Sequence, residues 1–379
     1  MSDPDQLQVR EIGFGHEAEP FIDVLWTVYA DDPTWIPTLR RAQRERLDPR
    51  TTPFLNYGQA QLFLVERDGR AIGRISAQIN PLHDDKWGER AGFFGHFDCL
   101  DDPAAARALF AVAESWLRER GAAFARGPFS FTINDESGCL VEGFETPPMV
   151  AMPHGRRWFP NLIEANGYAK VKDLWAYHYP VNSELEERRH RAWERIHAHE
   201  RIRVRPFDKR ELRRDVRIAA EIYNEAWAEN WGSVPITPEE ADRLAKDLIQ
   251  FADPELTAIV EIDGDPAAMV ISIPNLNECA RDIDGRLLPF GWAKLLWRLR
   301  RGPTSGRVML LGVRPKWRTR EFAQLGVMLT AEVHLRGAER GYQWAELGWV
   351  LEDNRLLNHQ LARTRAEVYK VYRIYEKAL

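Results

Sequence analysis

Hydrophobic and polar positions alternate along the chain in a pattern that predicts an α/β protein. Two strands are expected over residues 60–66 and 71–79, joined in a hairpin at Asp68-Gly69. Other patterns in the first half predict helices over residues 19–29, 103–121 and 159–165, strands over 92–99 and 124–129, and a closing hairpin through Tyr177. This order predicts a mixed twisted sheet with helices on both faces.

The second half of the chain repeats the same order of elements. The predicted helices cover residues 216–229, 321–340 and 354–363, and the predicted strands cover 257–262, 267–273, 308–313, 344–350 and 367–375. Short motifs recur as well, and Val65 to Gly69 returns 195 positions later as Val260 to Gly264. Two pairs return 198 positions later. Tyr29 with Pro37 corresponds to Trp227 with Pro235, and Lys172 with Tyr177 corresponds to Lys370 with Tyr375. A nearly constant offset predicts duplication of a whole domain. We expect domains at residues 1–182 and 204–379, joined by a charged connecting helix at 183–203.

Composition narrows the class of protein. The chain has 379 residues, of which 44% are hydrophobic, and its net charge of −5 argues against general nucleic-acid binding. Three widely spaced cysteines and no signal-peptide pattern predict a reducing cytoplasm. No uncharged apolar run approaches the ~20 residues of a membrane-spanning helix, so we expect at most peripheral contact with the inner face of a membrane. His197 and His199 lack partners at metal-ligand spacing, and we expect no metal site.

One basic turn occurs only in the second half. Leu310 to Arg320 reads as a strand that runs into a turn and opens a helix. Backbone N–H groups at such a helix start suit an anion, and small residues allow a phosphate to approach the backbone. The equivalent turn in the first half, Asp98 to Pro103, carries three carboxylates and would repel a phosphate.

The order of elements and this turn resemble the GNAT acyltransferase superfamily. The resemblance implies that the turn holds the pyrophosphate of acyl-CoA, which would be a co-substrate and not a permanently bound cofactor. The implied donor-binding residues are Leu311, Val313, Arg314, Arg318, Thr319, Arg320, Ala323 and Asn354. Glu321 stands where the GNAT pattern has glycine, and a carboxylate there opposes pyrophosphate binding. The alternative is a solvated basic helix start.

The first half contributes an acidic loop. This loop comprises Asn134 to Gly138, followed by Gly143-Phe144, Pro147-Pro148 and Met152 to His154. Its pattern is typical of a loop that reaches into a cleft, where Asp135, Glu136 or His154 could bind or deprotonate an amine. A turn that satisfies its own backbone is the alternative. A second resemblance is carried by Asn134 to Glu136, Gly143-Phe144, Asn354, Tyr369 and Tyr372. In these residues the chain resembles a family of paired GNAT proteins that includes the bacterial ceramide synthases.

That family resemblance implies acyl transfer from a thioester to a primary amine. The amine must lose a proton before attack, and the departing thiolate must gain one. We expect Glu346 to be the base, with Glu136 or Asp135 as rivals, and Tyr369 or Tyr372 to be the acid, unless these tyrosines only pack. The oxyanion would be met by a backbone N–H between Leu311 and Val313.

An insertion between two strands of the second half bears on the acceptor. Residues 287–301 are rich in Trp and Leu, and Trp292 to Arg301 interleaves them with Lys and Arg at helical spacing. This pattern fits a peripheral membrane contact, or a helix packed on the other domain. We expect a long-chain acyl transfer to a sphingoid amine, as in ceramide synthesis. An N-acetyltransferase or N-acyl amino acid synthase acting on a small amine, and a non-catalytic acyl-CoA or lipid binder, are the alternatives.

Overall fold

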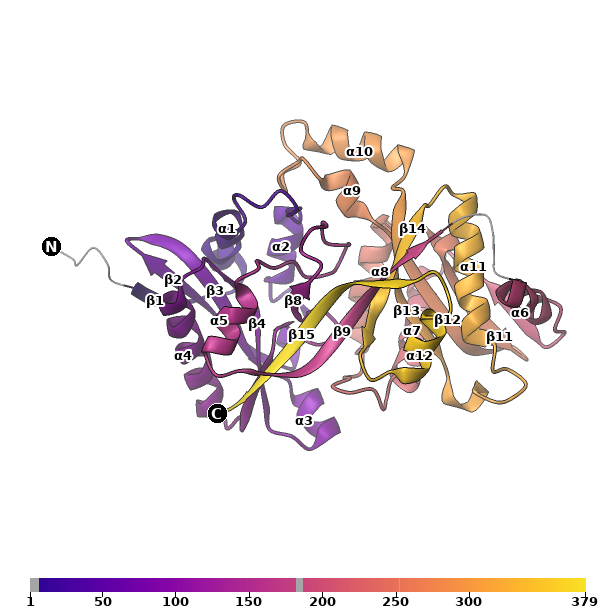
Figure 1. The fold of residues 1–379 in the computed structure, drawn as a ribbon, viewed down its shortest axis with the longest axis horizontal. Helices are drawn as coiled ribbons and strands as arrows, with labels where there is room; N and C mark the ends of the chain where they lie inside the picture. The colour runs from indigo at the N-terminus through magenta and orange to yellow at the C-terminus, as the bar shows by residue number, and fades with distance from the viewer. Residues whose placement is uncertain (1–6, 182–186, 252) are drawn as a thin grey trace.

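One sheet runs through both halves of the chain (Figure 1). The structure is a computed structural model that describes residues 7–181, 187–251 and 253–379. In sheet order the strands are β1 (Leu7–Ile12), β2 (Gln59–Arg67), β3 (Arg70–Ile79), β4 (Ala91–Cys99), β5 (Phe124–Gly127), β15 (Glu367–Ala378), β9 (Ala169–Pro180), β14 (Trp344–Leu351), β13 (Ser305–Val313), β12 (Asp265–Pro274), β11 (Thr257–Ile262) and β10 (Ile202–Arg205), and β8 (Cys139–Glu142) also pairs with β15. The short strands β6 (Phe129–Ser130) and β7 (Glu136–Ser137) form a separate pair.

Helices cover both faces of this mixed sheet, as predicted. The first half has α1 (Glu19–Val28), α2 (Arg40–Arg46), α3 (Pro81–Trp87), α4 (Pro103–Glu119) and α5 (Phe159–Ala165), and the second has α6 (Glu187–His197), α7 (Leu212–Ala226), α8 (Pro238–Phe251), α9 (Leu276–Ala280), α10 (Gly291–Arg301), α11 (Leu325–Glu339) and α12 (Arg355–Leu361). Four 3-10 turns, at residues 15–18, 53–56, 254–256 and 315–317, complete the described elements. On β11, Ile259 packs in the core under α7 and α8, whereas Ala258 and Val260 pack in the core under α6 and α11. This alternation buries the sheet on both sides.

The repeated motifs form twin hairpins. Asp68 and Gly69 have φ values of +52° and +73°, and Asp263 and Gly264 have +52° and +82°. Two successive left-handed residues are the geometry of a tight hairpin turn, which Asp-Gly adopts readily. The register shifts directly before both turns, at Val65/Glu66 and at Val260/Glu261. The prediction of one hairpin made twice is therefore confirmed.

The last strand of each half is exchanged with the other half. β9 lies between β14 and β15, and β15 also pairs with β5, so no hairpin closes the first half and that prediction was wrong. Figure 1 shows β9 and β15 crossing the middle of the molecule, with the C-terminus against the first half. The echoed tyrosines mark the exchange: Tyr177 Oη donates to Asn358 Oδ1 of the second half at 2.9 Å, and Tyr375 Oη donates to Glu164 Oε1 of the first at 3.0 Å.

Several boundaries differ from the predicted ones. α11 begins at Leu325 and not at Glu321, because Pro315 to Trp317 form a 3-10 turn and further turns separate it from the helix. α6 ends at His197, and β10 follows within the segment predicted as one helix. The first residues of that segment, 183–186, lie outside the described residues. At α4 the prediction holds, since the Asp102 carboxylate accepts from the N–H groups of Ala104 and Ala105, both at 3.0 Å.

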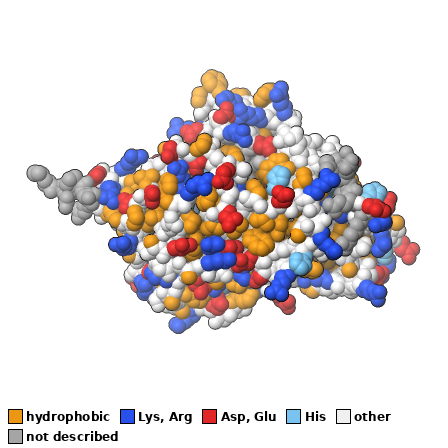
Figure 2. All heavy atoms as spheres, viewed as in Figure 1, with side chains coloured by type: hydrophobic (Ala, Val, Ile, Leu, Met, Phe, Trp, Pro, Cys, Tyr) orange, Lys and Arg blue, Asp and Glu red, His pale blue; other side chains and the backbone are white. Residues whose placement is uncertain are grey.

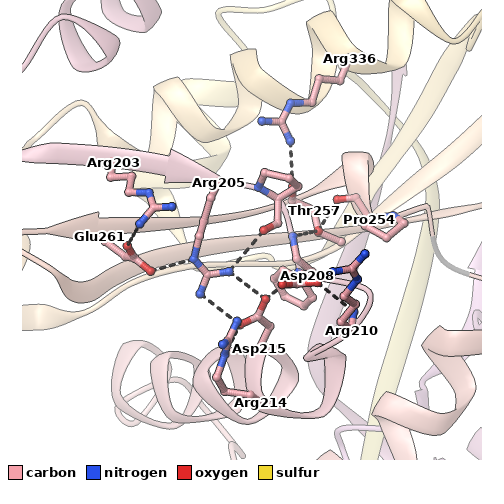
Figure 3. Close-up of polar contacts among 12 residues, drawn as sticks. Arg203, Arg205, Asp208, Arg210, Arg214, Asp215, Pro254, Thr257, Glu261 and Arg336 are labelled. Atoms are coloured by element: carbon pink, nitrogen blue, oxygen red, sulfur yellow. Dashed lines mark hydrogen bonds and ion pairs between the residues drawn. The ribbon is translucent and has the colours of Figure 1, made fainter.

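A buried ionic cluster ties α7 to the outer edge of the second half (Figure 3). Asp215 on α7 is fully buried, and its carboxylate lies 2.8 Å from Arg205 Nη1 of β10. The same guanidinium donates to Glu261 of β11 at 2.7 Å. Asp215 also accepts from the backbone N–H of Asp208 at 2.7 Å. The cluster thus fastens one helix to two strands, and its charges compensate one another.

Candidate active site between the two halves

The carboxylate of Glu346 lies in the middle of the sheet. It is fully buried on β14, beside Arg307 of β13, and the Arg307 Nε to Glu346 Oε1 distance is 3.2 Å. The pair is an ion pair without hydrogen-bond geometry. From β15, Tyr369 Oη reaches across β9 and donates to Glu346 Oε2 at 2.5 Å. The last three strands of the chain therefore converge on one carboxylate.

Burial controls the proton affinity of this cluster. It raises the pKa of Glu346, and the opposing effects of the Arg307 charge and the Tyr369 hydrogen bond do not cancel it. Burial also raises the pKa of Tyr369 and lowers the pKa of Lys370 to about 8. A carboxylate with a raised pKa is a better proton acceptor than an exposed glutamate, which is what a general base requires.

Tyr369 connects the buried carboxylate to an open groove of about 800 Å³. Its phenol ring lies edge-on to Trp344, with centroids 6.0 Å apart, and His178 stacks on Trp344 at 4.7 Å. The opposite wall combines residues 146–149 of the first half with α9, Arg298 of α10 and Thr304. A ligand in this groove would meet the Tyr369 hydroxyl, with Glu346 directly behind it.

Two cations of the second half bind the loop of the first half that forms one wall of this groove. Lys370 Nζ donates to the carbonyls of Gly143 and Thr146 at 2.6 and 2.8 Å. Arg307 Nη1 donates to the carbonyls of Val150 and Ala151 at 3.2 and 2.8 Å. Sequence reasoning missed both cations as site residues. The signals were present: Lys370 belongs to the recurring Lys-Tyr pair, and Arg307 is a lone charge next to an apolar strand.

The candidate residues of the first half lie in two environments. Glu136 and His154 line a cavity of about 200 Å³, where Glu136 forms an ion pair with Arg46. Asp135 Oδ2 instead accepts three hydrogen bonds at 3.0 to 3.1 Å from Phe131 and Thr132, as in the alternative of a turn that satisfies its own backbone.

The acidic candidates of the two halves meet around Arg307. Glu346, Tyr372, Tyr369 and Glu136 all lie close enough to influence the pKa of Arg307, which burial lowers. Tyr372 is fully buried, and its hydroxyl makes no hydrogen bond within the described residues. A Cβ on Gly138 would stand 2.7 Å from Tyr372 Cβ, so glycine is required where the acidic loop crosses β15.

Beyond this cluster, β13 and β14 separate. They pair from Ser305 with Trp344 to Val308 with Leu347, and β13 then continues along β12 alone. Two indoles lie at the gap: Trp227 Nε1 donates to the Leu311 carbonyl at 3.3 Å, and its ring lies 6.2 Å from that of Trp349. The separation leaves one side of Leu311 to Val313 without a strand partner.

The candidate donor-binding residues gather where β13 ends, except Asn354, which caps α12 by accepting from the Leu357 N–H at 3.2 Å. Arg314 is buried and lies 3.2 Å from Glu221, and Arg318 donates to the carbonyls of Val313 and Ala226 at 3.0 and 2.7 Å. Thr319, Arg320 and Ala323 are exposed.

The Glu321 carboxylate lies 3.1 Å from Arg201 Nη1, but the same guanidinium also pairs with Asp263 at 2.6 Å. Within the described chain, the N–H groups of residues 319–324 have no acceptor in good hydrogen-bond geometry. The turn therefore offers free backbone donors, as an anion site needs, beside a carboxylate that shares its arginine with Asp263.

Similarity to known proteins extends over the whole chain, although no family model matches it. The chain is 42% identical to the bacterial ceramide synthase of Caulobacter vibrioides, covering 98% of both chains, and 38% identical to protein YghO of Escherichia coli, covering 96% of this chain and 93% of YghO. Among solved structures, a tandem GNAT protein from the clavulanic acid biosynthesis pathway has a TM-score of 0.57 at 12% identity, covering 98% of both chains. A GCN5-related N-acetyltransferase from Sphaerobacter thermophilus has a TM-score of 0.52 at 16% identity, covering 99% of this chain and 96% of that one.

Proposed function

The chain belongs to the family of tandem GNAT acyltransferases that includes the bacterial ceramide synthase, and from this premise we propose that it transfers a long fatty acyl chain to the amine of a sphingoid base. It is an N-acyltransferase, and acyl-CoA is its co-substrate. The observation that carries the proposal is the hydrogen bond from Tyr369 to the buried Glu346, because it links a proton acceptor to a residue that lines a groove of about 800 Å³.

In the proposed reaction the acceptor enters the groove as an ammonium ion. Tyr369 takes a proton from the ammonium as it passes its own phenolic proton to Glu346, which leaves a free amine. The amine attacks the thioester carbonyl, so that a C–N bond forms and the C–S bond breaks. We assign protonation of the departing thiolate to Tyr372, whose hydroxyl makes no hydrogen bond within the described residues. The second proton, which the nitrogen loses as the amide forms, returns to the Tyr372 phenolate, and Glu346 releases the first proton to solvent.

The donor would lie along the gap between β13 and β14. The N–H groups of residues 319–324 and the exposed Arg320 would hold its pyrophosphate, while Arg314 and Arg318 brace the turn from behind. Six residues of strand separate Val313 from Arg307, which is about 20 Å. An extended pantetheine arm spans this kind of distance, and it would bring the thioester from the turn to the cluster around Glu346. The N–H groups between Leu311 and Val313 would stabilise the oxyanion.

We also propose that α10 makes a peripheral membrane contact. Five of the seven large hydrophobic side chains that are exposed in the described chain lie on or just before this helix, namely Leu288, Phe290, Trp292, Leu296 and Trp297. α10 buries none of its residues, which argues against a helix packed on the other domain. Figure 2 shows hydrophobic and basic side chains side by side on the projection at the top of this view, and Figure 1 places α9 and α10 there. No helix in the described ranges is long and apolar enough to cross a bilayer.

The membrane contact has its own test. The double variant W292S/W297S should lose most of its co-sedimentation with vesicles of phosphatidylcholine and phosphatidylglycerol. Leu356→Ser is the matched control, because Leu356 is 74% exposed but lies on α12. Equal binding by wild type and the double variant would refute the contact.

The reaction is tested with purified protein, palmitoyl-CoA or acetyl-CoA, and sphinganine, 3-ketosphinganine or a mixture of small amines. Free thiol and the mass of the product are followed together. Amide formation only with the long-chain donor and a sphingoid amine is the expected result. Turnover of acetyl-CoA with small amines would contradict it, as would acyl-CoA binding without any thiol release.

A further inference from the structure

A buried histidine faces the first-half cavity with one ring nitrogen unused. His154 Nε2 lies 2.9 Å from Asp32 Oδ2, whereas His154 Nδ1 is buried and makes no hydrogen bond within the described residues. The His154 side chain lines the cavity of about 200 Å³ together with Tyr29, Asp98 and Glu136. A buried acceptor without a donor is unfavourable, because it has lost its hydrogen bond to water. A ligand that donates to Nδ1 would remove this cost.

The hydrogen bonds of Asp32 determine which nitrogen of His154 carries the proton. Asp32 Oδ1 accepts from the N–H and the hydroxyl of Thr34, at 2.9 and 2.7 Å. Burial opposes ionisation of Asp32, but hydrogen bonds from Thr34 and His154 outweigh it and lower the pKa of this carboxyl. An ionised Asp32 can only accept, so the proton of the neutral imidazole sits on Nε2. Nδ1 is then left with an unshared electron pair.

The histidine is held in this neutral form. Burial lowers the pKa of His154, although Asp32 acts in the opposite direction. Tyr29 packs against the imidazole with ring centroids 5.4 Å apart, and Tyr29 Oη lies 3.3 Å from the His154 carbonyl. The ring therefore holds a fixed hydrogen-bond acceptor in the cavity wall, and because Nδ1 has almost no accessible surface, a ligand oxygen reaches it only with a small shift of the lining.

The charges that line the cavity are already paired. Arg74 lies 2.7 Å from Asp98, which also accepts from Tyr29 Oη at 2.6 Å. Arg46 forms an ion pair with Glu136. A charged ligand would have to break one of these pairs, whereas a neutral group with a hydroxyl donor would disturb none of them.

We propose that this cavity binds a neutral hydroxyl-bearing group, with the hydroxyl donating to His154 Nδ1. Glu136 and Gly138 place the cavity next to Tyr372, so the hydroxyl would belong to the part of the acceptor that adjoins its amine. This identification of the ligand rests on the proposed function. The Asp32–His154 pair then selects acceptors by the oxygen substituents beside the amine.

Asp32→Asn provides a sharp test, because it exchanges the donor and acceptor nitrogens of His154 with almost no change in side-chain volume. The two donors of Thr34 would hold the carbonyl oxygen of the new side-chain amide, so its NH₂ group would face His154 Nε2. Nε2 must then accept, and Nδ1 must carry the proton. His154 becomes a donor to the cavity, and it should favour a ligand oxygen that can only accept.

Binding is measured by calorimetry without acyl-CoA, using three small amines as probes. These are 2-amino-1,3-propanediol, its dimethyl ether, and propan-2-amine, which has no oxygen. Wild type should bind the diol about tenfold more tightly than either other probe, which corresponds to one hydrogen bond. Asp32→Asn should reduce the advantage of the diol and raise affinity for the dimethyl ether, and His154→Phe should abolish all discrimination.

His359→Gln is the control, because His359 is exposed on α12. The proposal is overturned if wild type binds none of the probes or does not discriminate among them, or if Asp32→Asn leaves the order of affinities unchanged while its thermal unfolding matches wild type. Failure of the proposed acyl transfer would appear separately, as loss of thiol release with intact probe binding.

Discussion

At Glu346, burial and neighbouring charge act on the same proton in opposite directions. Because the pKa of Glu346 is raised above 4.5, the acid limb of a kcat/KM profile should lie above that value. Tyr369→Phe removes a hydrogen bond that lowers this pKa, so the acid limb should move to higher pH. An unmoved limb in Tyr369→Phe would show that another group sets it.

Replacement of the carboxylate itself should be more severe. Glu346→Gln keeps the shape of the side chain and is expected to lower kcat about 10²- to 10⁴-fold through loss of the base. Arg307 retains its bonds to the carbonyls of Val150, Ala151 and Gly348, so the fold should persist. Glu367→Gln, an exposed change on β15, is the matched control and should keep full activity.

Gly143 carries a steric requirement that Gly69 lacks. Both have left-handed φ values, +88° and +73°, but a Cβ on Gly143 would stand 2.2 Å from the Tyr369 carbonyl, and one on Gly69 would meet nothing within 4 Å. Gly69→Ala should cost about 1 kcal/mol of unfolding free energy for its backbone conformation, and Gly143→Ala about 3 kcal/mol. Urea unfolding measures the difference, and equal costs would contradict the close packing at Gly143.

Burial of His83 should make the free energy of unfolding depend on pH. Burial, with the charges of Arg126 and Lys86, lowers its pKa from 6.5 to about 4. The unfolded chain binds this proton more readily, so the stabilisation is complete above pH 6.5 and is lost as pH falls through about 4, on the order of 3 kcal/mol. In urea unfolding at several pH values, His83→Phe should remove this part of the pH dependence. The exposed His359→Gln should leave it intact.

Single residues show where sequence reasoning reached the site and where it stopped. Glu346 was expected to be the base and Tyr369 or Tyr372 the acid. Tyr369 lies 2.5 Å from Glu346, a contact that was not expected, and the catalytic roles of these residues remain predictions. Lys370 was recognised only as part of a repeat, because its partners are carbonyls of a loop more than 200 residues away. The unused nitrogen of His154 depends on a contact with Asp32 across 122 residues. A local sequence pattern cannot reveal contacts between residues so far apart in the chain.

Among the elements, prediction succeeded for type and failed for partnership. The strand pattern of residues 367–375 is correct, but periodicity does not say which strand lies beside it, and β15 turned out to pair with β5, β8 and β9. The late start of α11 has a similar reason. Arg318 bonds to carbonyls of Val313 and Ala226, and this tertiary contact holds residues 318–324 outside the helix.

The attachment of α7 to the sheet can be tested through Asp215. Asp215→Ala would leave the mostly buried Arg205 guanidinium with Glu261 and the Pro206 carbonyl, and should cost about 3–5 kcal/mol of unfolding free energy. Asp242→Ala, which breaks a more exposed pair with Arg217 at 2.9 Å, should cost much less, because solvent screens this pair. Denaturant unfolding compares the two, and similar costs would argue against the buried cluster as the anchor.

For the whole molecule, duplication was predictable and the exchange of strands was not. β9 supplies the neighbour of β14, and β15 supplies the neighbour of β5, so each half contains an essential strand of the other. A chain cut at a protease site inserted between Val181 and Glu187 should therefore elute as one particle from a sizing column and separate only in denaturant. Two separately eluting, folded halves would contradict this.

The exchange also bears on the history of the gene. Where duplicated domains keep their own strands, a stop codon or a new start at the boundary can return them to independent proteins. Here such a break would give two polypeptides, each of which lacks one strand of its sheet and carries one strand that belongs to the sheet of the other. The duplication is in this sense irreversible. Neither half can be shed without leaving the other one strand short.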